Sequence, residues 1–234
     1  MSEREIVFDT ETTGLEAGID KLVEIGAVEL VNRVPTGRVW HRYVNPGRPI
    51  SPDAIAVHGI TNEKVAHEPR FRELAADLAA FLEGATLIAH NASFDVGFLD
   101  AEFGEAGLPA LDPERVVDTL ALARKRFPGA NNTLDALCRR FSVDAGRRVK
   151  HGALLDAELL AEVYGEMMGG RQSLMALEAG AREAGASGTS GAAAKRPGPR
   201  PVRLTDAEAE AHAAFVATLA DGGRWEGPRE RAQE

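Results

Sequence analysis

Cysteine is nearly absent from this 234-residue chain, which has one, at position 138. A lone cysteine excludes an internal disulfide framework and a cysteine-based zinc site, and it is typical of proteins in a reducing cytoplasm. No uninterrupted apolar run approaches the roughly 20 residues that a membrane-spanning helix needs. The charged residues 1–5 do not form a signal-peptide pattern. These absences predict a cytoplasmic protein.

Positive charge is also scarce, because 27 lysines and arginines stand against 36 aspartates and glutamates, for a net charge of −9. Proteins that bind long duplexes usually carry a basic surface, so this balance argues against tight nonspecific duplex binding. It does not exclude chemistry on nucleic acid, because bound divalent cations offset carboxylates. An enzyme that grips only a strand end also needs few phosphate contacts.

The composition changes near residue 170. Residues 179–201 are mainly Ala, Gly, Ser, Thr and Pro, which predicts a flexible linker. After it, Thr205 and Asp206 are typical of a helix N-cap, and Phe215 and Leu219 would share one face of a short helix that ends before Trp225. The predicted parts are a folded domain over 1–170, a peptide over 171–178, a linker over 179–201 and a tail over 202–234.

Residues 1–170 show a mixed α/β pattern. Strands are predicted over 6–8, 22–30, 39–44 and 86–89, and helices over 72–82, 94–105, 117–125 and 133–141 and after 154. Gly14 and Gly37 are expected to supply the turns of antiparallel hairpins among the first three strands. Strands that then alternate with helices predict one mixed sheet flanked by helices.

Two carboxylates end the first predicted strand. Asp9 and Glu11 are two residues apart, so their side chains project from the same side of the strand. Such a pair repels itself unless a cation lies between the two groups. Hard oxygen ligands suit Mg²⁺ or Mn²⁺. Taken alone, the pair is also typical of a solvated strand end.

Two further segments carry candidate residues. In the first, Asp95 lies in the first turn of a predicted helix, where the helix dipole favours an anion, and Phe94, Phe98 and Leu99 are expected to pack. In the second, His151 precedes a predicted helix that Asp156 enters. Each segment by itself is also explained by an ordinary first-turn charge or a surface histidine.

Together the three segments resemble the DEDD exonucleases, the DnaQ-like superfamily with an RNase H-like fold, over residues 5–168. The resemblance implies an α/β fold with a mixed sheet flanked by helices. It also implies that Asp9, Glu11, Asp95 and Asp156 hold two divalent ions, Mg²⁺ or Mn²⁺. His151 stands where the histidine branch, DEDDh, has its general base. A 3′→5′ exonuclease that releases nucleoside monophosphates from DNA 3′ ends is therefore expected.

The resemblance extends to residues 51–61, which match the family segment that contacts the terminal nucleotide. Val57 and His58 would help to hold the 3′ base and sugar, with Phe94 and Leu15 packing nearby, and Asp53 is a less secure contact. Asp9, Glu11 and Asp156 are also expected to touch the substrate. For His58, a satisfied structural histidine is the alternative.

The residues after the domain favour a proofreading role. A clamp-docking peptide of the kind that fills the pocket of the bacterial sliding clamp is predicted from Gln172, Leu174, Met175 and Leu177. The tail with Phe215, Leu219 and Trp225 resembles the one that attaches proofreading exonucleases to the catalytic subunit of bacterial DNA polymerase III. A small accessory subunit is a further possible partner. The alternatives are a stand-alone exonuclease acting on RNA or short oligonucleotides, and a non-catalytic tether between clamp and polymerase.

Basic residues interrupt the acidic background in two groups. They are interpreted mainly as solvated helix ends, with contact to the DNA backbone as the alternative. The residues are Arg124, Lys125 and Arg126, followed by Arg139, Arg140, Arg147, Arg148 and Lys150.

Overall fold

The computed structural model describes residues 3–146 and 150–169, together with six positions between 205 and 214. They belong to two compact units, one within residues 1–184 and the other within residues 185–234. None of the described helices is long and apolar enough to cross a membrane. The residues of the predicted clamp peptide and the anchors of the tail lie outside the described residues: Gln172, Leu174, Met175, Leu177, Phe215, Leu219 and Trp225.

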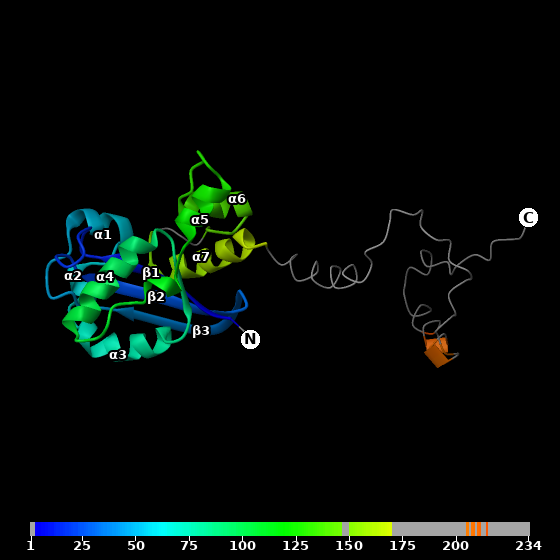
Figure 1. Cartoon of the computed structure of the whole chain (residues 1–234), viewed down its shortest axis with the longest axis horizontal. Coiled ribbons are helices and arrows are strands. Elements are labelled where there is room, and N and C mark those ends of the chain that lie inside the picture. Colours follow the sequence, from blue (N-terminus) through cyan, green and yellow to red (C-terminus); the bar gives the residue numbers. More distant parts are fainter. Residues whose placement is uncertain are drawn as a thin grey trace, which may run out of the picture. The chain divides into compact units, whose positions relative to one another are not determined.

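A five-stranded mixed sheet forms the centre of the first unit, in the order β3-β2-β1-β4-β5 (Figure 1). The strands are β1 (Arg4–Thr12), β2 (Leu22–Val31), β3 (Val34–Tyr43), β4 (Thr86–Ala89) and β5 (Val116–Asp118). β1 pairs antiparallel with β2 and parallel with β4, and β4 pairs parallel with β5. The mixed sheet is therefore confirmed. The carboxyl ends of β1, β4 and β5 lie at one edge, which is where open α/β sheets bind ligands.

Helices connect and cover the strands. They are α1 (Pro52–His58), α2 (Asn62–Val65), α3 (Phe71–Leu82), α4 (Ala92–Glu105), α5 (Thr119–Arg126), α6 (Leu134–Phe141) and α7 (Ala153–Met167). The short helices α1 and α2 were not predicted, since neither is long enough to show an apolar period. Hydroxyl caps start both of them: the Ser51 side chain accepts from the Ala54 N–H and the Thr61 side chain from the Lys64 N–H.

The turn between β2 and β3 differs from the prediction. It is formed by Asn32 and Arg33, whose φ angles of 51° and 66° are the left-handed geometry of a two-residue hairpin turn. Gly37 lies inside β3 instead, with a φ of 84°. The prediction was wrong because it assigned the turn to glycine, and here asparagine and arginine adopt left-handed backbone geometry.

The prediction of a helix from residue 117 was also wrong at its start. Val116–Asp118 form β5, which pairs with β4, and the helix begins at Thr119. The Asp118 side chain caps this helix by accepting from the Leu120 N–H over 2.9 Å. Pairing with a neighbouring strand outweighed the local helical period.

Helices cover both faces of the sheet, and β1 contributes to both cores. Ile6 and Phe8 pack into a core with residues of α3 and α4, whereas Val7 packs into a second core with residues of α5, α6 and α7. Side chains of a strand alternate between faces, so Asp9 and Glu11 continue the row of Val7 and lie on the α7 face. The pleat of β1 thus orients the two carboxylates.

The second unit contributes one described feature. Ala207, Glu208, Glu210, Ala211 and Ala214 are helical. The Thr205 hydroxyl accepts from the Glu208 N–H over 3.3 Å, while the Glu208 carboxylate accepts from the Thr205 N–H over 2.8 Å. This reciprocal pair is a capping box, and it confirms the predicted helix start at Thr205.

Candidate active site

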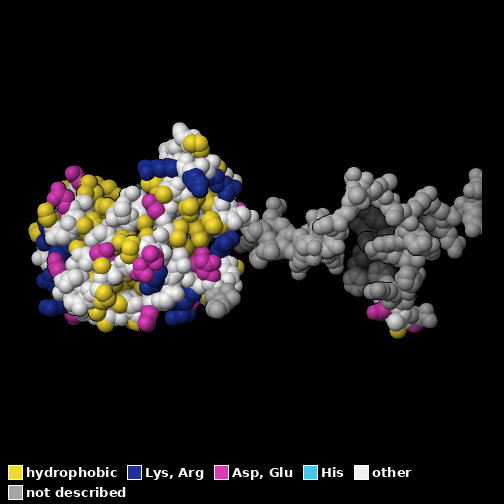
Figure 2. All heavy atoms as spheres, viewed as in Figure 1, with side chains coloured by type: hydrophobic (Ala, Val, Ile, Leu, Met, Phe, Trp, Pro, Cys, Tyr) yellow, Lys and Arg dark blue, Asp and Glu magenta, His cyan; other side chains and the backbone are white. Residues whose placement is uncertain are grey.

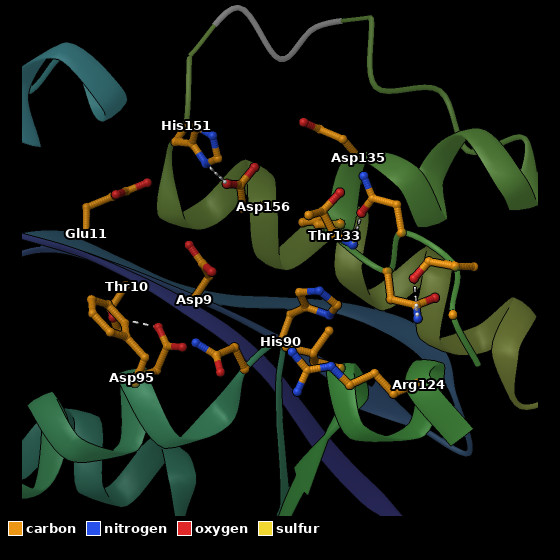
Figure 3. A pocket seen from close by; sticks show the side chains of 18 residues that line it. Asp9, Thr10, Glu11, His90, Asp95, Arg124, Thr133, Asp135, His151 and Asp156 are labelled. Atoms are coloured by element: carbon orange, nitrogen blue, oxygen red, sulfur yellow. Dashed lines mark hydrogen bonds and ion pairs between the residues drawn. The ribbon is translucent and has the colours of Figure 1, made fainter. Parts of the chain in front are cut away.

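A pocket of about 1050 Å³ lies at the carboxyl edge of the parallel strands. Its lining contains the four predicted carboxylates and the predicted base, and Figure 3 shows them facing the same space: Asp9, Glu11, Asp95, His151 and Asp156. Three segments that are far apart in the sequence are therefore brought together by β1, α4 and the start of α7.

The surroundings of Glu11 strongly favour its protonated form. Its side chain is buried, and in β1 it lies opposite Glu24 of β2. Burial raises the pKa of Glu11 to about 8; the charges of Asp156, Glu24 and Asp95 also raise it, whereas His151 lowers it. A carboxyl group with this pKa is mostly neutral at pH 7 unless a cation offsets the neighbouring charges.

Asp95 reaches the site from the opposite side of β1. It lies in the first turn of α4 and is only 3% exposed. The Thr10 hydroxyl donates a hydrogen bond to its Oδ1 over 2.6 Å. Burial raises the pKa of Asp95, and the bond from Thr10 acts against that rise. Thr10 therefore fixes the orientation of a carboxylate that its environment tends to neutralise.

His151 and Asp156 form a pair at the start of α7. His151 Nδ1 lies 3.1 Å from Asp156 Oδ2. An ionised carboxylate can only accept, so Nδ1 carries the proton and Nε2 remains able to receive one. The Asp156 side chain is 3% exposed and that of His151 is 47% exposed. The histidine is thus held from its buried side and open to solvent on the other.

Glu24 anchors the same helix start and was not predicted as a site residue. One of its oxygens accepts from the Ala153 N–H over 3.0 Å, and the other lies 2.7 Å from His41 Nε2. Glu24 is 4% exposed. Burial acts to raise the pKa of Glu24, but bonds from His41 and Ala153 outweigh it and hold the pKa low. The available signal was a charged residue inside the otherwise apolar stretch 22–28.

The donor set fits hard divalent cations. Ligand atoms of Glu11, His151 and Asp156 all lie within 4.8 Å of one another. Asp9 and Asp95 line the same pocket, so all four carboxylates that were predicted as metal ligands are present there. The pKa values of Glu11 and Asp95 are raised, and a cation bound among the carboxylates would restore their ionised forms.

The other wall of the pocket was not recognised from the sequence as part of the site. It is formed by the end of β4, by α5 and by the connection from α5 to α6. Its side chains include His90, Arg124, Thr133 and Asp135, which Figure 3 shows across the pocket from Glu11. From the sequence, Arg124 was only one of several basic residues interpreted as solvated helix ends.

The residues predicted to contact the terminal nucleotide separate into two groups. Phe94 lines the pocket, and its ring centre lies 4.9 Å from that of Phe98. The side chain therefore packs against Phe98 as predicted and also faces the pocket. Asp53, Val57 and His58 belong to α1 and are not among the described lining residues. Asp53 is exposed, as is half of Val57.

His58 is held by the backbone on both sides of its ring. Nδ1 accepts from the Ile60 N–H over 2.9 Å, so Nε2 carries the proton and faces the Thr12 carbonyl at 3.2 Å. Burial lowers the pKa of His58. These contacts are those of a neutral structural histidine that ties α1 to the end of β1.

Comparisons with known proteins agree with the three motifs. Residues 6–164 match the model of a family described as exonuclease. DNA polymerase III subunit epsilon of Haemophilus influenzae is 51% identical over 178 residues, which cover 73% of this chain and 70% of that protein. The protein of the same name from Escherichia coli is 48% identical over 179 residues, or 73% and 74% of the two chains.

Solved structures share the fold. Exonuclease X in complex with 5′ overhanging duplex DNA is 30% identical, with a TM-score of 0.55, and the match covers 70% of this chain and 90% of that one. The nuclease domain of 3′hExo, a DEDDh family member bound to rAMP, is 17% identical with a TM-score of 0.59, over 71% and 92% of the two chains. The mixed sheet and its helices are thus the RNase H-like arrangement expected from the motifs, and the chain belongs to the DnaQ-like exonuclease family.

Proposed function

We propose that this exonuclease is the proofreading subunit of a bacterial DNA polymerase III and removes nucleoside monophosphates from DNA 3′ ends. The observation that carries the proposal is the convergence of four carboxylates and His151 on one pocket. Identity of about half the residues to proteins named DNA polymerase III subunit epsilon supports the assignment to a replicase.

In this proposal, Asp9, Glu11, Asp95 and Asp156 hold two divalent ions, Mg²⁺ or Mn²⁺. Two such ions activate a water and offset charge on the attacking and leaving oxygens of a phosphodiester. The carboxylates keep the ions in place, and Thr10 and the start of α7 keep the carboxylates in place.

His151 is the proposed general base. Its Nδ1 donates to Asp156, so Nε2 is the atom that takes the proton of the attacking water. A histidine suits this step because its ordinary pKa is near neutrality. The exposed side of the ring leaves room for the water and the strand end. Asp156 then has two roles, as a metal ligand and as the partner that orients the base.

Four residues are proposed to contact the terminal nucleotide. Phe94 is an aromatic side chain that lines the pocket. Val57 and Leu15 are exposed apolar side chains, at 50% and 83%, that can pack against a base. Asp53 is an exposed acid at the start of α1. His58 contributes by holding α1 against β1.

The proposed partners are the catalytic subunit of the polymerase, through the tail with Phe215, Leu219 and Trp225, and the sliding clamp, through the peptide that begins at Gln172. A small accessory subunit is a third partner, and the cytoplasm is the proposed location. The capping box at Thr205 supports a helical start for the tail.

The test compares three substrates on the full chain: a DNA primer with a 3′ mismatch, the matched primer and an RNA oligonucleotide. Release of monophosphates from DNA, faster from the mismatched end and dependent on Mg²⁺ or Mn²⁺, is expected. Asp9→Ala should abolish it. Strong preference for RNA would replace the proofreading assignment with a stand-alone exonuclease. A chain without metal-dependent release that still co-purifies with polymerase and clamp would be a tether.

A further inference from the structure

The pocket is larger than the carboxylate cluster requires. Its volume of about 1050 Å³ is at the upper end of what a drug-sized ligand occupies. The wall opposite Glu11 carries the side chains of His90 and Arg124 and the connection over residues 129–133. This wall has room for a part of the substrate beyond the bond that is cut.

Arg124 is the only arginine or lysine among the described residues that line the pocket. Figure 2 shows that basic side chains gather over α5 and α6, and one arginine of each helix, Arg126 and Arg140, has other partners. Arg126 donates to the Met167 carbonyl, and Arg140 donates to Asn132 Oδ1 over 3.2 Å and lies 4.4 Å from the Phe127 ring centre. In the described part of the chain, no hydrogen bond or ion pair engages the Arg124 guanidinium.

His90 lies on the same wall of the pocket and has a buried ring nitrogen to account for. The Thr119 hydroxyl donates to the Ala89 carbonyl over 3.1 Å, so it accepts from His90 Nδ1, which lies 2.9 Å away. The other nitrogen, Nε2, is buried and has no partner in hydrogen-bond geometry among the described residues, although the nearby backbone of Asn132 acts to raise the pKa of His90 against the effect of burial. A buried polar atom without a partner carries an uncompensated desolvation cost. A bound group, or a water that the group carries, would remove that cost.

We propose that Arg124 binds a backbone phosphate of the substrate strand upstream of the bond that is cut, with His90 Nε2 accepting from a water on the same stretch of strand. The inference rests on the proposed function. A released nucleoside monophosphate contains only the phosphate that was attacked. A second phosphate in the pocket must therefore belong to the strand that remains.

This subsite separates two phosphates along the pocket. In this proposal the attacked phosphate lies at Asp9, Glu11 and Asp156, and the upstream phosphate lies at Arg124, which Figure 3 shows on the other side of the pocket. A guanidinium suits a phosphate because it donates two parallel hydrogen bonds. The contact would set which linkage enters the carboxylate cluster and would favour a strand end over a short fragment.

The experiment uses the full chain with Mn²⁺ and two probes. One is a single-stranded DNA oligonucleotide, and the other is the 5′-p-nitrophenyl ester of thymidine monophosphate, which has no upstream phosphate. Arg124→Ala should raise the KM for the oligonucleotide by roughly 10- to 100-fold, as expected for a hydrogen bond to a charged group. Hydrolysis of the ester should be unchanged.

Lys125→Ala is the matched control, because Lys125 is an exposed neighbour on α5 that does not line the pocket. It should leave both substrates unaffected. A second oligonucleotide carries one neutral methylphosphonate, at the linkage next to the terminal one. The unmodified protein should bind it less tightly than the all-phosphate oligonucleotide. The same change should have no effect on Arg124→Ala, because the contact is already gone.

Equal losses on the ester and the oligonucleotide would overturn the subsite, because Arg124 would then act on the attacked phosphate or on the fold. An unchanged KM for the oligonucleotide would overturn it as well. Arg124→Gln, with the same unfolding temperature as the parent, guards against a folding defect. Failure of the unmodified chain to hydrolyse either probe would instead overturn the proposed function, and the subsite with it.

Discussion

The backbone N–H of Ala153 donates to Glu24 over 3.0 Å, so a carboxylate of β2 caps the helix that begins between His151 and Asp156. The first N–H groups of a helix have no partner within the helix and need an acceptor. Here the acceptor comes from a strand 129 positions earlier in the chain. The contact fixes how α7 meets the sheet, and with it the placement of two site residues.

We expect Glu24→Ala to slow catalysis more than Glu24→Gln. The amide oxygen of glutamine can still accept from Ala153, whereas alanine removes the cap. Loss of the cap should lower the free energy of unfolding by about 1–3 kcal/mol. Unfolding in denaturant and kcat on DNA are the measurements. An unchanged kcat for folded Glu24→Ala would limit Glu24 to a structural role.

Gly26→Ala should separate α7 from β2. A Cβ at this position would lie 2.2 Å from the Leu154 nitrogen and 2.4 Å from the Ala153 carbonyl carbon. These are backbone atoms that cannot move aside, so a loss of about 1–3 kcal/mol or more is expected in thermal or denaturant unfolding. Gly165→Ala is the control: nothing lies within 4 Å of its Cβ, and it should stabilise α7 by roughly 0.5–1 kcal/mol. Tolerance of Gly26→Ala would contradict the close contact.

His151→Ala should lower kcat by about 10²- to 10⁴-fold, the usual contribution of a general base. Asp156 retains its place in α7, so Mn²⁺ binding measured by calorimetry should persist. A ring nitrogen of His151 lies within 4.8 Å of a carboxylate oxygen of Glu11 and of Asp156, which is close enough for the three residues to hold one ion. A loss of metal affinity that matches the loss of rate would therefore reassign His151 as a ligand.

Thr10→Val should remove the hydrogen bond that orients Asp95, while the side chain at position 10 keeps nearly the same size and shape. The hydroxyl that donates over 2.6 Å is lost, and the carboxylate becomes easier to protonate. We expect a higher Mn²⁺ concentration for half-maximal activity than in the parent. Thr10→Ser keeps the hydroxyl and should stay close to the parent. Equal metal requirements for Thr10→Val and Thr10→Ser would show that the bond does not orient Asp95.

Glu29, in β2, is expected to make the free energy of unfolding depend on pH. Burial acts to raise the pKa of Glu29, but bonds from Arg4 and Thr36 and the charges of Arg38 and Arg4 hold it below its ordinary 4.5. The folded pKa is thus the lower one, so this stabilisation is present above pH 4.5 and is lost as pH falls through the folded pKa. Glu29→Gln should lower the unfolding temperature at pH 7, and the difference should shrink in acid. A constant difference would contradict this linkage.

The sequence was sufficient to predict features that depend on a local apolar period or on residues close together in the chain. The alternation in β1 put Asp9 and Glu11 on one side, and the apolar periods located β2, β4, α3, α4 and α6. It missed α1 and α2, which are too short to show a period, and β5, whose strand conformation depends on pairing with β4. The hairpin turn at Asn32 was missed because glycine was expected there.

By itself the sequence determined the family and predicted the four carboxylates and the histidine, because motif order and residue chemistry are properties of the chain. Only the tertiary structure decided that Thr10 holds Asp95, that Glu24 caps α7 and that Arg124 faces the pocket across from Glu11. These relationships join residues 85 to 129 positions apart. No local pattern encodes them, because they arise where the edge of a sheet meets the ends of three helices.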